Sequence, residues 1–131
     1  MSFDWSKFLD LANNLSGGDE SSKRSAISRA YYAAFCSARD RLTKSGVYIP
    51  RTGEAHDRVP ALYALSRDYD SQEISKALMR EKIVRNSADY DCVFDGDLDD
   101  SAGRSLQRAE KTLKSVNNMP EVIIDEIKSK I

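Results

Sequence analysis

The segment from Arg24 to Leu42 contains neither glycine nor proline and is rich in alanine, so it predicts one long helix. One side of this helix is apolar, with residues spaced by three and four: Ile27, Tyr31, Ala34, Ala38 and Leu42. A second side, at the same spacing, combines arginines with a ring and a thiol: Arg29, Tyr32, Cys36 and Arg39. This second side either presents donors and a flat ring to a phosphate-bearing partner or seals a contact with another helix.

Helical spacing recurs along the rest of the chain, and no segment alternates apolar and polar side chains as a half-buried strand does. Further helices are predicted at Phe3–Leu15, about Asp57–Tyr69, Ser71 to about Asp89, about Asp99–Val116, and Pro120 to the C-terminus. The expected N-caps are Ser21 or Ser22 for the long helix and Ser71 for the fourth, and Pro60 is expected in the first turn of the third.

Apolar side chains in several of these segments are expected to pack inward. They include Tyr48 in the loop Gly46–Gly53 and Ile74, Leu78 and Ile83 in the fourth helix. The last helix is expected to be amphipathic and contains Val122, Ile123, Ile124, Ile127 and Ile131. A chain of 131 residues is long enough to bury one core. We therefore expect a single domain over residues 1–131, folded as an all-α antiparallel bundle.

Nothing in the sequence indicates a membrane or secreted protein. There is no run of about 20 apolar residues, and the N-terminus has neither the basic start nor the apolar core of a secretory signal. Cys36 and Cys92 lack the spacing of metal ligands or of a disulfide framework, so they are expected to be free thiols. These features favour a cytoplasmic location without a membrane partner.

The net charge of -1 hides an uneven distribution. Six basic residues and one acid, Asp40, lie between Lys23 and Lys44, whereas six aspartates and no base lie between Asp89 and Asp100. The near-neutral total excludes strongly basic DNA-coating proteins but not a local basic patch that faces RNA or nucleotide. The two regions are also complementary to each other, within the fold or across a dimer. The aspartates do not follow the ligand spacing of a calcium loop, which favours a solvated acidic turn.

Few residues suit a cofactor or a metal. There is no glycine-rich phosphate loop. His56 is the single histidine, so a histidine-based metal site or a Ser-His-Asp triad has little to draw on. Its simplest interpretation is a polar residue near a helix start. The sequence predicts no metal and no cofactor.

A candidate binding segment runs from Arg80 to Asp91. Arg85 and Asp89 are four residues apart and therefore share one face of a helix. They either form an intrahelical ion pair, or Arg85 clamps a phosphate while Asn86 and Tyr90 supply polar contacts.

Two segments together resemble the HEPN family (higher eukaryotes and prokaryotes nucleotide-binding). They are Arg24-Ser-Ala-Ile-Ser-Arg-Ala-Tyr-Tyr-Ala-Ala-Phe35 and, about fifty residues further on, Arg85-Asn-Ser-Ala-Asp-Tyr-Asp91. The helix from Ala102 to Leu113 also fits the closing helix of the family, so the resemblance covers about Phe8 to Val116. It implies a four- or five-helix up-and-down bundle that forms a two-fold homodimer, in which the arginine-bearing segments of both subunits line a shared cleft.

Many HEPN proteins are metal-independent endoribonucleases, including toxins neutralised by a small nucleotidyltransferase antitoxin. Their catalytic pattern is an Arg, four to six residues, then a His that is often followed by a Tyr. Arg85 matches the Arg, Asn86 the polar residue beside it and Tyr90 the Tyr, but the segment around Asp89 and Tyr90 holds no His. General acid–base catalysis is worth about 10²–10⁴-fold in rate, and His suits it because its pKa lies near neutrality. Here that help would have to come from Asp89 as a base or from His56 on another helix.

Three hypotheses follow. The leading one is a homodimeric HEPN-type module that binds RNA or nucleotide, beside a nucleotidyltransferase partner in a toxin–antitoxin or defence setting. Its cleft would be lined by Arg85, Asn86, Asp89 and Tyr90, with Arg24, Arg29 and Tyr32 adding donors and a stacking surface. The second is an endoribonuclease toxin that uses Arg85 with Tyr90, Asp89 or His56. The third is a purely structural bundle that Arg–Asp contacts hold together.

Overall fold

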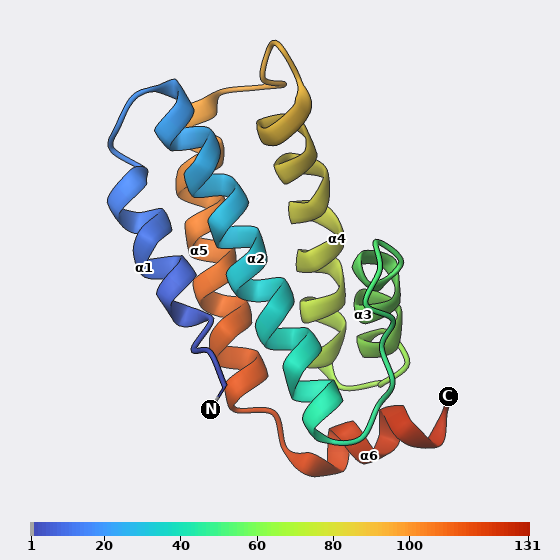
Figure 1. Ribbon diagram of the computed structural model, residues 1–131. Coiled ribbons are helices and arrows are strands. Elements are labelled where there is room, and N and C mark those ends of the chain that lie inside the picture. Colours follow the sequence, from blue (N-terminus) through green and yellow to red (C-terminus); the bar gives the residue numbers. More distant parts are fainter. Residues whose placement is uncertain (1) are drawn as a thin grey trace.

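A computed structural model describes residues 2–131, and six helices make up most of this part of the chain (Figure 1). They are α1 (Ser6–Leu15), α2 (Glu20–Lys44), α3 (Ala55–Tyr63), α4 (Tyr69–Tyr90), α5 (Leu98–Asn117) and α6 (Glu121–Ser129). Helices α1, α2, α4 and α5 run alternately up and down as a bundle, α3 lies beside α4, and α6 crosses one end. The prediction of an all-α bundle is confirmed.

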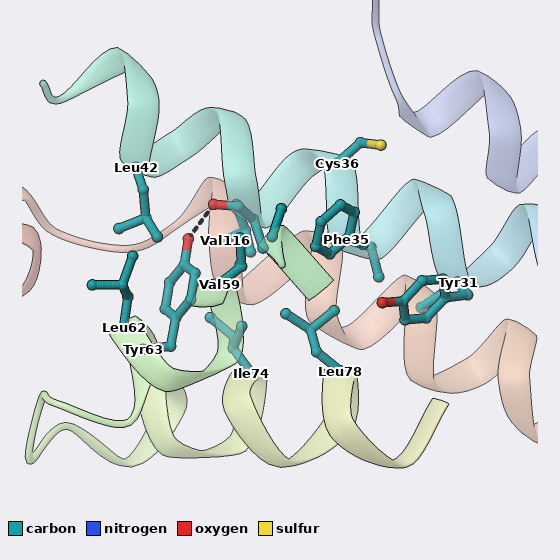
Figure 2. Packing of buried hydrophobic residues seen from close by; sticks show 14 of the residues in the cluster. Tyr31, Phe35, Cys36, Leu42, Val59, Leu62, Tyr63, Ile74, Leu78 and Val116 are labelled. Carbon is teal, nitrogen blue, oxygen red and sulfur yellow. Dashed lines mark hydrogen bonds between the residues drawn. The ribbon is translucent and has the colours of Figure 1, made fainter. Parts of the chain in front are cut away.

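Helix α2 lies at the centre of the bundle and packs against α1, α4 and α5. Its alanines explain how one helix can have three close neighbours, because their small side chains let the other backbones approach. The buried ones are Ala26, Ala30, Ala33, Ala34 and Ala38. Figure 2 shows the larger core side chains that fill the space beside them, from Leu42 of α2 to Leu78 of α4. Among them, Tyr63 satisfies its buried hydroxyl by donating to the carbonyl oxygen of Ala38 at 2.7 Å.

Two aspartates, and not the expected serines, cap the long helices. The Asp19 carboxylate accepts the Ser22 N–H at 2.9 Å, and the Asp68 carboxylate accepts the Ser71 N–H at 3.0 Å. A carboxylate there both satisfies a free N–H group and interacts well with the positive end of the helix dipole. Helices α2 and α4 therefore begin before the predicted positions. The Ser71 hydroxyl is buried and donates instead to the carbonyl of Tyr63.

The boundaries of two other helices, the first and the third, differ from those predicted. Helix α1 begins at Ser6, not Phe3, and the Asp4 carboxylate accepts the N–H of Ser6 at 3.0 Å. Helix α3 begins before Asp57 and ends at Tyr63, well before Tyr69. Pro60 consequently lies in its second turn, where proline removes one helical hydrogen bond. An ion pair of 2.8 Å between Asp57 and Lys82 ties this short helix to α4.

Two side chains that were expected to pack inward are exposed: Tyr48 and Ile83. Helix α4 shows the reason most clearly. Its buried positions continue from Leu78 through Glu81 to Arg85 at helical spacing, which leaves Ile83 on the opposite face, 72% exposed. The inner side of α4 is therefore partly charged. Within residues 2–131, no helix combines the length and the apolar character needed to cross a bilayer.

Candidate functional site

Arg85 is a buried cation that lies against two tyrosine rings, which also contact each other. Its side chain is 7% exposed, and its guanidinium lies 5.2 Å from the ring centre of Tyr31 and 5.4 Å from that of Tyr32. Both distances suit cation–π attraction. The Asp89 carboxylate is 3.8 Å away, longer than the ~2.7–2.9 Å of a charge-assisted hydrogen bond. The Nε of Arg85 is buried without a hydrogen-bond partner. The described fold thus positions Arg85 firmly while leaving hydrogen-bonding capacity on its guanidinium unused.

His56 joins this cluster from α3. Its Nδ1 lies 2.7 Å from the hydroxyl oxygen of Tyr31, and its ring stacks on Phe35 with centres 4.3 Å apart. Burial raises the pKa of Tyr31, so the phenol keeps its proton, and its hydroxyl either donates to Nδ1 or accepts from Nδ1–H according to the tautomer of His56. Burial, and then the nearby positive charge of Arg85, lower the pKa of His56, so the imidazole is neutral at pH 7. One arginine, one neutral histidine and two tyrosines therefore meet where α2, α3 and α4 pack together.

The single histidine makes this geometry testable by NMR. The ring of His56 should titrate below the ordinary pKa of 6.5, and Arg85→Met should raise that pKa because it removes a nearby positive charge. A lowered folded-state pKa means that the unfolded chain binds more protons, so stability should fall as the pH drops through and below about 6.5. Arg104→Met, at an exposed position of α5, is the control and should leave the titration unchanged. If the pKa of His56 were the same in the wild type and in Arg85→Met, the two side chains would not be close enough to form the described cluster.

A groove of about 520 Å³ adjoins His56 between the C-terminal half of α2, the loop 45–54 and the start of α3. Its lining includes three aromatic rings and two arginines: Tyr32, Phe35, His56, Arg39 and Arg51. One carboxylate, Asp40, also lines it, but this group already accepts from the indole N–H of Trp5 at 2.6 Å and pairs with Arg39 at 3.0 Å. The groove is therefore aromatic, with its acidic group already engaged.

Some of the predicted site residues come together and some do not. Arg85, Tyr32 and Asp89 are neighbours, and the Ser28 hydroxyl donates to Asp89 at 3.1 Å. Arg29 lies on the Tyr32 ring at 5.1 Å and also covers Phe8 at 4.8 Å. The second side of α2 thus seals a contact with α1, which was one of its two expected roles, and Tyr32 on that side lies against Arg85.

Three further residues of the predicted cleft lie elsewhere. Arg24 donates to the carbonyl oxygens of Ala88, Asp91 and Cys92, so it caps the C-terminal end of α4. Asn86 and Tyr90 are exposed on the outer side of α4. Within a single chain they do not reach the Arg85 cluster, and a role for them in a cleft requires a second subunit.

Sequence reasoning assigned Tyr31 to the core and gave His56 no position relative to Arg85. Tyr31 is indeed buried. Its hydroxyl nevertheless faces His56 rather than a backbone carbonyl. No local pattern links these residues, since they come from different helices. Both cysteines are free, as predicted; Cys36 is buried beside the groove and Cys92 is exposed.

Comparison of the chain with models of known protein families, with curated proteins and with solved structures gives no match. The geometry around Arg85 is therefore the basis for assigning a function.

Proposed function

We propose that this chain is a HEPN-type helical protein that binds RNA or nucleotide with Arg85 as its phosphate receptor. The observation that supports this most directly is the state of Arg85: buried, held against two tyrosine rings, and without a hydrogen bond for its Nε. A buried donor without a partner costs about 1–3 kcal/mol, so the guanidinium of Arg85 has hydrogen-bonding capacity that the bundle itself does not use. The planar guanidinium fork matches the oxygens of a phosphate group.

The proposal includes a homodimer. Met79, Ile83 and Tyr90 are each more than half exposed and lie four and seven residues apart, so they form one apolar stripe along α4. Asn86 shares that side. A two-fold contact between two such stripes would bury them and bring the Arg85-bearing helices of both subunits together. The resemblance adds a small nucleotidyltransferase as the expected partner, which the neighbouring gene would reveal most directly.

A second candidate, the metal-independent endoribonuclease, is favoured by the contact between Tyr31 and His56. In the tautomer whose Nδ1–H donates to the Tyr31 oxygen, Nε2 keeps its lone pair. A neutral imidazole of this kind beside a phosphate-binding arginine can accept the proton of a ribose 2′-hydroxyl, which is the task of the missing family histidine. The leaving 5′-oxygen must also gain a proton, and the cluster offers no second imidazole, since His56 is the single histidine of the chain. Binding without cleavage is for that reason the preferred function.

One experiment separates the two. Purified protein is mixed with end-labelled single-stranded RNA in EDTA, and both the bound fraction and the integrity of the RNA are measured from low to high salt. We expect intact RNA and an affinity that falls as salt rises, because phosphate contacts release counterions. Cleavage in EDTA that is lost in His56→Gln would favour the nuclease. The absence of both binding and cleavage would contradict both functions and leave the structural bundle. Sedimentation of the same samples should show a dimer.

A further inference from the structure

Phosphate binding at Arg85 does not need the groove beside His56. The lining of this groove suits the part of a nucleotide that is not phosphate. We infer that this groove holds one unstacked nucleobase, belonging to a nucleotide whose phosphate is bound at Arg85. The inference rests on the proposed function and specifies which part of the ligand is recognised beyond its charge.

The size and lining of the groove fit a flat aromatic ring. Its volume of about 520 Å³ falls within the roughly 300–1,000 Å³ of small-molecule sites. Tyr32 and His56 are partly exposed and supply ring surface on the side of α2 and α3, with Phe35 buried behind them, and Ile49 and Pro50 supply apolar surface from the loop. Every base has a π-face, so aromatic side chains bind bases whatever the sequence.

The charges in and beside the groove fit a ligand that carries phosphate. Arg39 is held against the Phe35 ring at 5.9 Å and paired with Asp40, whereas Arg51 is exposed in the loop. With Asp40 engaged by Arg39 and by Trp5, the free charge at this end is positive. Arg85 adds a second positive centre nearby, because Tyr32 lines the groove and also contacts the Arg85 guanidinium.

This arrangement selects against a double helix. In a duplex the bases are stacked and paired, and they cannot enter a side pocket without being extruded. An unpaired nucleotide can place its base in the groove and its phosphate on Arg85 together. The ligand is therefore a nucleotide unit, either a free mononucleotide or part of single-stranded RNA.

The test compares ligands with and without bases. The probes are a five-nucleotide oligoadenylate, a five-unit sugar-phosphate backbone of tetrahydrofuran spacers without bases, and adenosine monophosphate. Thr43→Trp places a large ring in the groove from an exposed position of α2 that lines it. Ser25→Trp is the matched control, because it adds the same ring at another exposed position of α2 away from the groove. Melting temperatures check that both variants fold.

Wild-type protein should bind the oligoadenylate on the order of 10-fold more tightly than the base-free backbone. Thr43→Trp should remove that difference while keeping the affinity for the backbone, and Ser25→Trp should change neither. Equal wild-type affinity for the two five-unit ligands would overturn the base site and leave phosphate binding at Arg85 intact. Failure to bind either ligand would remove the proposed function as well. Competition by adenosine monophosphate would identify the free nucleotide as a ligand, and its failure would assign the groove to RNA.

Discussion

An Arg85→Met variant is expected to bind single-stranded RNA about 10- to 100-fold more weakly than the wild type, and yet to be no less stable. The loss of affinity follows from the loss of charge-assisted hydrogen bonds to phosphate, which are worth about 1.5–3 kcal/mol. Methionine has a similar length and can keep the apolar contact with the rings of Tyr31 and Tyr32. Binding is measured by fluorescence anisotropy, and the free energy of unfolding by urea titration.

The unusual part of this expectation is the unchanged stability. Arg85 makes one long ion pair and leaves its Nε without a partner, so its removal from the bundle gives up little. Replacing a buried charge by a well-packed apolar side chain is often neutral or stabilising. Arg104→Met, at an exposed site on α5, serves as the control and should lower RNA affinity by less than threefold, roughly the effect of one remote charge. An Arg85→Met chain that loses several kcal/mol would show that Arg85 belongs to the scaffold.

Arg108→Ala is expected to lower the free energy of unfolding by roughly 2–4 kcal/mol. Glu81 is buried between α4 and α5, where its carboxylate accepts from Arg108 at 2.8 Å and from the Ser105 hydroxyl at 2.5 Å. Removing Arg108 leaves that carboxylate buried with one partner fewer, and breaking a buried pair costs about 3–5 kcal/mol. The loss expected for Arg108→Ala is smaller than this general range because the Arg108 side chain is 30% exposed and water can enter in its place.

The same helix provides a matched control. Arg104, one turn before Arg108, pairs with Asp100 at 2.8 Å, but both side chains are more than half exposed. An exposed pair of this kind contributes little, so Arg104→Ala should change the free energy of unfolding by less than about 0.5 kcal/mol. Similar losses in the two variants would mean that burial of Glu81 does not set the strength of its pair. Urea unfolding followed by circular dichroism measures both.

The sequence allowed the helices to be placed better than the site. Periodic apolar residues along α2 and α5 marked helices whose stripes must be buried, and such patterns are local. The starts of α2 and α4 were predicted too late because Asp and Ser are both good N-cap residues and each occurs near these starts. Ile83 was misplaced because an apolar residue is normally a better candidate for burial than Arg85.

The candidate site was predictable only where its residues lie close in sequence. Arg85 and Asp89 stood out as a pair four residues apart, and the structure keeps them as neighbours. Tyr31 and His56 are 25 positions apart and belong to different helices, so their contact depends on how α3 docks. Propensity and spacing carry no information about that docking.

The origin of His56 in α3 has a consequence for how the protein can fail. Helix α3 has nine residues, whereas Arg85 lies in α4, a helix of 22 residues that is part of the four-helix bundle. Short peripheral helices open at a lower free energy than central ones. Opening of α3 alone would carry His56 and one wall of the groove away, while Arg85 stayed against Tyr31 and Tyr32. Heat or mild denaturant should thus convert the protein into a form that still holds phosphate but no longer discriminates what the phosphate is attached to.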